Sequence, residues 1–144
     1  MGGSLLNFEI VVSKEASQED LASIAAPLSE YNLQNGPPPN FLKVALLVKS
    51  PDQKTVGGLW GLAAYDWLFV EYLAVPTELR RLGLGRTLMQ KAEQIAIEHS
   101  CIGVWLDTFA FQALPFYEKL GYQRFGQLDD HPRGSTRYFL QKRL

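Results

Sequence analysis

The spacing of hydrophobic and polar positions changes along the chain, and each change predicts a different kind of element. An apolar run at 8–12 predicts a first strand. Residues 17–35 follow a helical pattern with Ser17 as the expected N-cap, and Pro27 is expected to divide this helix into two pieces. The prolines at 37–39 end it. Apolar stretches at 41–49, 55–65 and 67–75 then predict three strands that pair as an antiparallel meander.

The second half of the chain begins with a return to helical spacing. Apolar residues recur every three or four positions between 84 and 96, which predicts a long helix before a strand at 102–108. A short helix at 112–120, closed by Gly121 as a left-handed cap, precedes strands at 122–128 and 137–140. The strand–helix–strand order over 67–108 forms a crossover, so one pair of strands is parallel.

This order predicts an α+β fold with a mixed, mostly antiparallel central sheet. It contains about seven strands and about four helices, in one domain over residues 1–144. The 144 residues, 47% of them hydrophobic, are enough for one core.

Charge and residue usage exclude several classes of protein. The net charge of −1 excludes an acidic tail or a wholly basic nucleic-acid module. Cys101 is the one cysteine and there are two histidines, so neither a disulfide within the chain nor a metal centre is expected. The first residues lack a basic start and a long apolar stretch, and no window approaches the roughly 18 apolar residues of a spanning helix. We therefore expect a cytoplasmic protein that contacts no membrane.

The segment from Val75 to Leu88 carries the strongest chemical signal. A strand ends there, a loop brings Arg80 and Arg81, Gly83 and Gly85 follow, and a helix begins. Glycines allow backbone N–H groups to approach a ligand, and a helix N-terminus adds free donors and partial positive charge. A pyrophosphate suits this arrangement. The segment lacks the third glycine of a dinucleotide fingerprint and the Gly-Lys-Ser/Thr of a Walker loop, so a helix start with packing glycines is an equal alternative on these residues alone.

Two motifs in order resemble the signatures of the GNAT family of N-acetyltransferases. Arg80-x-x-Gly83-x-Gly85 resembles Q/R-x-x-G-x-G/A, the acetyl-CoA signature of that family. The stretch 112–122 resembles the second signature, A-x-x-x-Y-E-K-L-G-F/Y. The specific match covers about residues 67–125. The family ordinarily carries an asparagine where this chain has Ala110, so either Gln112 substitutes for it or the contact is absent.

The resemblance implies a splayed pair of parallel strands that holds acetyl-CoA. The pantetheine arm would pair with the main chain of the strand before the glycine loop, and the loop and helix start would hold the pyrophosphate. The residues implied in binding the donor are Leu73, Ala74, Val75, Arg80, Arg81, Leu82, Gly83, Leu84, Gly85, Arg86, Thr87, Gln112 and Phe116.

The resemblance also implies a mechanism, in which a primary amine attacks the thioester directly. Tyr117 is the expected donor of a proton or hydrogen bond to the departing thiolate, and without the motif it would be interpreted as a buried aromatic. Glu71, which alternation places on one face with Leu73, is the expected base, acting directly or through water. Asp107 is a second candidate and a candidate ligand of the amine. The alternative to a catalytic role is that Glu71 and Asp107 are solvent-exposed carboxylates on strands.

The acceptor and the partners are less determined. Glu30 and Tyr31 fall where the family often covers the acceptor site. Acidic and aromatic candidates favour a cationic small amine, although a peptide amine remains open, and a homodimer through 138–140 is possible in such a fold. One alternative is a non-catalytic acyl-CoA-binding sensor or partner module, against which the retained Tyr117 argues. Another is a nucleic-acid or nucleotide-phosphate binder using the arginines, against which the near-neutral charge argues.

Overall fold

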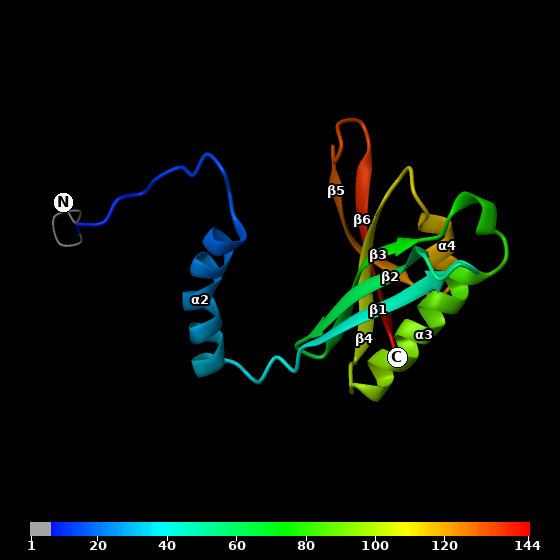
Figure 1. Ribbon diagram of the computed structural model, residues 1–144, viewed down its shortest axis with the longest axis horizontal. Coiled ribbons are helices and arrows are strands. Elements are labelled where there is room, and N and C mark those ends of the chain that lie inside the picture. Colours follow the sequence, from blue (N-terminus) through cyan, green and yellow to red (C-terminus); the bar gives the residue numbers. More distant parts are fainter. Residues whose placement is uncertain (1–6) are drawn as a thin grey trace. The chain divides into compact units, whose positions relative to one another are not determined.

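The computed structural model describes residues 7–144 in two compact units, Met1–Pro38 and Pro39–Leu144. The first unit contributes one helix, α2 (Gln18–Asn35), drawn in blue in Figure 1. The predicted strand at 8–12 is wrong, because these residues form no strand. A strand needs a hydrogen-bonded neighbour. The one regular element that the structure describes in this unit is a helix, which offers none.

The predicted division of the helix at Pro27 is also wrong, since α2 runs through it. Proline removes one backbone hydrogen bond and crowds the preceding turn. Here both ends are closed: Ser17 and Asp20 form a reciprocal capping box, and the N–H of Gly36 donates to the carbonyl of Asn32 at 2.8 Å. The hydrogen bonds along 18 residues outweigh the one that is lost.

The second unit contains a six-stranded sheet in the order β1-β2-β3-β4-β6-β5 (Figure 1). All neighbours are antiparallel except β3 and β4, as the crossover predicts. The unit comprises β1 (Leu42–Lys49), β2 (Thr55–Ala64), β3 (Trp67–Ala74), a short 3-10 turn η1 (Thr77–Leu79), α3 (Leu84–Glu98), β4 (Gly103–Phe109), α4 (Leu114–Lys119), β5 (Gln123–Asp129) and β6 (Thr136–Arg143). Residues 7–144 thus hold six strands and three α-helices, where about seven and four were expected, and both differences fall in the first unit.

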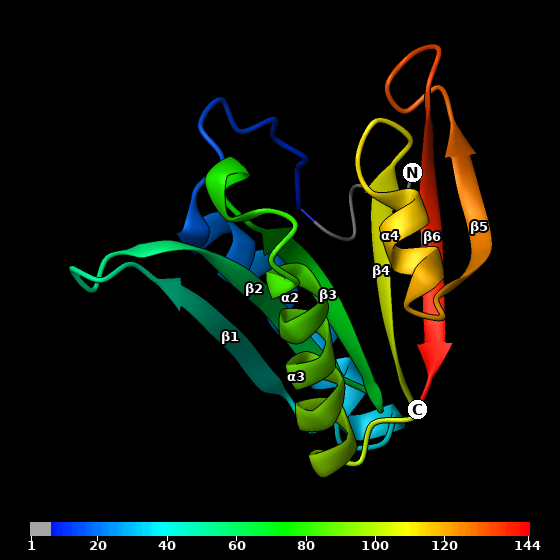
Figure 2. The same ribbon diagram turned by 90° about the vertical axis from the view of Figure 1, so that its right-hand side faces the viewer.

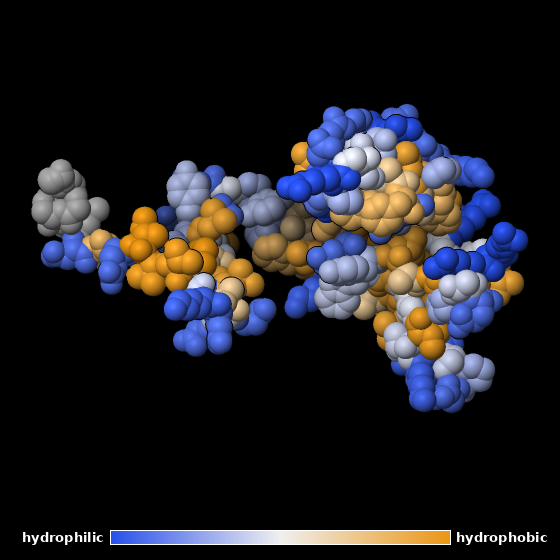
Figure 3. Space-filling model, turned by 90° about the horizontal axis from the view of Figure 1, so that it is seen from above, coloured by the Kyte–Doolittle hydropathy of each residue, from blue (hydrophilic) through white to orange (hydrophobic). Residues whose placement is uncertain are grey.

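The core of the second unit lies between the sheet and two helices on one of its faces. Figure 2 shows α3 and α4 together on that face. The buried stripe of α3 (Leu88, Met89, Ala92 and Ala96) packs in one cluster with buried strand residues such as Leu68 and Leu106. Figure 3 shows hydrophilic residues, in blue, bordering hydrophobic surface, in orange, on the larger body, which is this unit.

A partly buried polar cluster joins α3, the turn after α4 and β6. The hydroxyl of Tyr122 donates to Glu93 Oε2 at 2.8 Å, and Lys142 Nζ donates to Glu93 Oε1 at 3.0 Å. Burial raises the pKa of Tyr122 above its ordinary value, and the hydrogen bond to Glu93 adds to the rise. The cluster fixes the end of α4, because Tyr122 directly follows Gly121, whose φ of 97° confirms the predicted left-handed cap.

The parallel strands separate partway along their length. Their pairing runs from Trp67 beside Gly103 to Val70 beside Leu106 and then stops, although β3 continues to Ala74 and β4 to Phe109. A bulge accompanies the separation. The β2 register skips Glu71, since it pairs with Val70 and then with Tyr72. Beyond these pairs, the main chain of β3 has no partner on its β4 side.

Candidate functional site

Two adjoining pockets occupy the opening between the separated strand ends. The first has a volume of about 480 Å³ and is lined from β3, β4, α4 and β6. The second, of about 720 Å³, is lined by the end of β3, the loop before α3 and the start of α4. They share the residues Leu73, Gln112, Ala113 and Tyr117. A molecule spanning both pockets would therefore pass Tyr117.

The second pocket is built around the N-terminus of α3. Gly83 is the N-cap of this helix, with a left-handed φ of 79°, and a Cβ added there would meet nothing within 4 Å. The glycine is needed for its backbone angle, and the space beside it is open. Arg81 (φ 67°) and Arg86 also line the pocket. Free N–H groups, a helix dipole and two arginines together suit a polyanion.

Arg80 has a structural part in this loop. Its Nε donates to the carbonyl of Val75 at 3.2 Å, which ties the loop back to the end of β3. Two predicted donor-binding residues, Leu82 and Thr87, lie outside the lining, and the Thr87 N–H already donates to Gly83 at 3.0 Å. The structure brings the other predicted donor-binding residues together in this pocket: Leu73, Ala74, Val75, Arg80, Arg81, Gly83, Leu84, Gly85, Arg86, Gln112 and Phe116.

Gly85 has a different reason to be glycine. A Cβ there would lie 3.1 Å from Cζ of Phe116, closer than ordinary packing allows. The start of α3 therefore rests directly on the Phe116 ring of α4. That ring meets Tyr117 edge-on, with ring centroids 5.1 Å apart. The loop of the second pocket and the tyrosine are thus linked through one aromatic side chain.

Gln112 is already engaged within the chain. Its Oε1 accepts from the N–H of Phe109 at 2.8 Å and from the Thr108 hydroxyl at 3.3 Å, which closes the turn between β4 and α4. The Gln112 side chain still lines both pockets. At Ala110, where the resemblance would imply an asparagine, the backbone N–H donates to the carbonyl of Thr136 at 2.9 Å.

Tyr117 is buried at the junction of the pockets, with 8% of its surface exposed. Burial raises its pKa from the ordinary 10.0 to about 12, and the charge of Asp107 adds to the rise. The hydroxyl therefore keeps its proton throughout the physiological pH range and is available as a hydrogen-bond donor.

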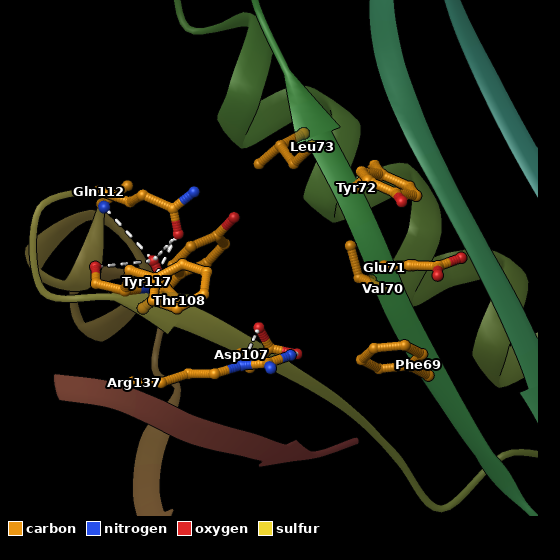
Figure 4. A pocket seen from close by; sticks show the side chains of 12 residues that line it. Phe69, Val70, Glu71, Tyr72, Leu73, Asp107, Thr108, Gln112, Tyr117 and Arg137 are labelled. Carbon is orange, nitrogen blue, oxygen red and sulfur yellow. Dashed lines mark hydrogen bonds and ion pairs between the residues drawn. The ribbon is translucent and has the colours of Figure 1, made fainter. Parts of the chain in front are cut away.

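The carboxylates Glu71 and Asp107 both line the first pocket, from opposite strands (Figure 4). Figure 4 shows Glu71 and Tyr72 extending toward the β2 side of β3, whereas Leu73 extends toward β4. The expectation that Glu71 and Leu73 share a face is therefore wrong, because the bulge at Glu71 interrupts the alternation. Asp107 is the carboxylate whose charge reaches Tyr117.

The sequence did not identify every residue of the site. Arg137 lines the first pocket and pairs with Asp107, and Phe111 lines the second with 70% of its surface exposed. No local motif marks either residue. Arg137 reaches the site through the β4–β6 register, which a sequence pattern does not specify. Glu30 and Tyr31 lie on α2 in the first unit, so their role in acceptor binding stays a prediction.

Within residues 7–144, no group of three or more His, Cys, Asp or Glu side chains is arranged to hold a metal ion. None of the helices in this part of the chain combines the length and hydropathy needed to cross a membrane.

Comparison with known proteins gives one consistent result. The family model described as "Acetyltransferase (GNAT) family" matches residues 15–122. The chain is 33% identical over 139 residues to acetyltransferase Atu2258 of Agrobacterium fabrum, covering 96% of this chain and 100% of that protein. It is 40% identical over 89 residues to the blasticidin-S acetyltransferase of Streptomyces morookaense, covering 61% of this chain and 65% of that protein.

Solved structures agree with these relatives. A crystal structure of a protein from Agrobacterium tumefaciens, assigned as an acetyltransferase, superposes with a TM-score of 0.90 at 31% identity. The match covers 95% of this chain and 100% of that one.

Proposed function

The chain belongs to the acetyltransferase (GNAT) family, and we propose that it moves an acetyl group from acetyl-CoA to a primary amine. The proposal takes residues 1–144 as a single N-acetyltransferase domain, in line with relatives matched over nearly their whole length. The observation that carries it is the position of Tyr117. This residue lies where a pocket suited to a polyanion adjoins a pocket whose lining includes Glu71 and Asp107.

The second pocket would bind the donor. Its pyrophosphate would lie at the N-terminus of α3, against backbone N–H groups and the side chains of Arg81 and Arg86. Its amide-rich pantetheine arm would run along Leu73, Ala74 and Val75, beside the β3 main chain that β4 leaves unpaired. The thioester would then reach Tyr117 at the junction of the pockets.

The first pocket would bind the acceptor amine, which attacks the thioester carbonyl directly. A C–N bond forms, the C–S bond breaks and the sulfur leaves as a thiolate. The amine gives its proton to Glu71, directly or through water, with Asp107 as the second candidate base. Glu71 is exposed on the bulge of β3, so a water-mediated transfer suits its position.

Tyr117 would stabilise the leaving thiolate by hydrogen bonding and protonation. A tyrosine pKa of about 12 lies roughly 3.5 units above that of an ordinary thiol of about 8.5. Complete proton transfer to a free thiolate would thus be uphill by about 5 kcal/mol. The rate advantage therefore comes mainly from the hydrogen bond to the developing negative charge, which precedes any final protonation.

The first test is thermal unfolding with excess acetyl-CoA, with ATP and NADH as controls. A ligand at about 100 times its dissociation constant adds roughly 2.7 kcal/mol of stability, which moves the midpoint of such a domain by several degrees. We expect a shift with acetyl-CoA and none with the controls. A panel of primary amines, followed by release of free thiol, then tests transfer itself. A shift without thiol release for any amine would favour the non-catalytic acyl-CoA-binding module, and no shift would contradict the donor site.

A further inference from the structure

The first pocket contains an ion pair with a fixed geometry. Arg137 Nε donates to Asp107 Oδ1 at 2.9 Å, and Arg137 Nη2 lies 2.7 Å from Asp107 Oδ2. The guanidinium thus holds both carboxylate oxygens in a fork. The two side chains are largely withdrawn from solvent, with 29% of Arg137 and 16% of Asp107 exposed. Such a fork fixes the direction of a carboxylate, which a single contact does not.

Neighbouring rings fix the guanidinium in turn. The Arg137 guanidinium carbon lies 5.4 Å from the ring centroid of Phe109 and 5.4 Å from that of Phe139. The β4–β6 register explains this placement, because Phe109 is paired with Arg137 and Asp107 is paired with Phe139. Arg137 on β6 and Asp107 on β4 are therefore diagonal neighbours in this pairing. Figure 4 shows the Arg137 side chain extending to Asp107.

We propose that Arg137 is a positioning residue that aims Asp107 at the acceptor amine, and that this pocket selects small cationic amines that carry no carboxylate. The inference rests on the proposed acetyl transfer. Asp107 and Tyr117 line the same pocket, and the charge of Asp107 reaches the tyrosine, so an amine anchored on Asp107 lies near the leaving thiolate. An anchor that swung freely would bind the same amine in orientations that miss the thioester.

The charge of the lining supports the acceptor class. Glu71 and Asp107 carry two negative charges against the one positive charge of Arg137, which leaves the pocket at −1. The Arg137 guanidinium already donates hydrogen bonds to Asp107 and lies beside the rings of Phe109 and Phe139. An acceptor carboxylate would therefore find no free countercharge in the lining.

The remaining lining supports a cation with an apolar body. The Thr108 hydroxyl donates to Gln112 Oε1, so both groups are used within the turn. Phe69, Val70 and Leu73 supply apolar and aromatic surface from β3. Ammonium groups are attracted both to carboxylates and to aromatic faces. An amine with a ring or an aliphatic chain would match both.

Substitutions at Arg137 test the positioning role. We expect Arg137→Gln and Arg137→Lys each to lower kcat at least tenfold at saturating amine. The KM for acetyl-CoA should stay within twofold, and the KM for the amine should not rise. A purely structural role would lower the unfolding midpoint and change both KM values. If the role were only to supply a positive charge, Arg137→Lys would keep full kcat, and that result would overturn the proposal.

A matched control is present in the same sheet. Arg124 also binds a carboxylate, with its Nε 3.1 Å from Glu118 Oε2, and lies 4.9 Å from the ring of Tyr138. It is outside both pockets. Arg124→Lys should therefore leave kcat unchanged. An equal loss of kcat in this variant would show that any broken ion pair in the sheet has the effect, and would overturn the assignment to Arg137.

Matched acceptors test the substrate class. Tyramine, phenethylamine, agmatine and cadaverine each differ by one carboxylate from tyrosine, phenylalanine, arginine and lysine. With thiol release as the assay, we expect kcat/KM to be at least tenfold higher for the amine than for the amino acid in any pair that reacts. Asp107→Asn should remove most of this preference by raising the KM for the amine. Higher activity with the amino acids, or none with all four amines while acetyl-CoA binds, would overturn the inference and leave donor binding standing. Failure to bind acetyl-CoA would overturn the proposed function as well.

Discussion

Replacing Tyr117 with phenylalanine removes one hydroxyl from the point where the two pockets meet. The ring remains to fill its site against Phe116 and Tyr122, whose ring centroids lie 5.1 and 6.2 Å away. A hydrogen bond to a charged group is worth about 1.5–3 kcal/mol, which corresponds to a loss of roughly 10- to 150-fold in kcat. Because the bond forms only as the thiolate develops, the KM for acetyl-CoA should stay within about twofold.

The assay is thiol release at saturating acetyl-CoA with the best amine from the panel. Full activity of Tyr117→Phe would refute the donor role, and a loss confined to the KM for acetyl-CoA would show that the hydroxyl binds the donor instead. The raised pKa gives a second check. Since Tyr117 keeps its proton up to about pH 12, wild type and variant should show the same pH dependence between pH 6 and 9. An alkaline decline near pH 8–9 that disappears in the variant would contradict the assignment.

The same substitution changes stability at high pH. The pKa of Tyr117 rises from 10.0 unfolded to about 12 folded, so its contribution is complete below pH 10 and is lost as the pH rises through 12. Two units correspond to about 2.7 kcal/mol. Measured by urea unfolding, the wild type should therefore lose stability between pH 10 and 12 more steeply than Tyr117→Phe. Equal slopes would show that the hydroxyl is not buried as described.

Three further substitutions test the surroundings of the site. Gly83→Val should weaken acetyl-CoA binding at least 100-fold. The control Gly134→Val changes a glycine of similar positive φ and equally open space in the β5–β6 turn, so it should lose similar stability and keep its affinity for acetyl-CoA. Equal affinities of the two variants would show that the pyrophosphate binds elsewhere. Gly85→Ala should raise the KM for acetyl-CoA several-fold without lowering the thermal midpoint, because its Cβ would press on the Phe116 ring. Unchanged kinetics of this variant would contradict the contact. Tyr122→Phe loses a 2.8 Å hydrogen bond to the partly buried carboxylate of Glu93 and should lower the unfolding free energy in urea by about 1.5–3 kcal/mol. An unchanged unfolding midpoint would contradict this.

Local patterns predicted the second unit well because its elements depend on local chemistry. Helical spacing from 84 to 96 and the cap at Gly121 belong to elements whose hydrogen bonds join residues close in sequence. Predictions for the first unit were wrong where structure depends on contacts or on bonds outside the local pattern. The apolar run at 8–12 has the composition of a strand and no neighbour that makes it one. At Pro27, a local rule for helix ends was outweighed by intact turns on both sides.

The site shows the same division. The glycine loop and Tyr117 were predicted from motifs, and both line the second pocket. The direction of Glu71 was predicted wrongly, and the partner of Asp107 was not predicted. The first depends on a bulge that adds one residue to β3, and the second on a register that joins positions 107 and 137 across two strands. Pattern and composition do not specify either.

The separation of β3 from β4 has a consequence for how such an enzyme can change over time. If the main chain of β3 recognises the donor arm, that recognition has no side chain that a point mutation can remove. The side chains of the same strand that line the first pocket without a proposed part in catalysis or donor binding, such as Phe69 and Tyr72, remain free to vary. A lineage could therefore explore new amines one substitution at a time while its use of acetyl-CoA persists. Directed evolution of acceptor choice should begin at these positions and leave the glycine loop untouched.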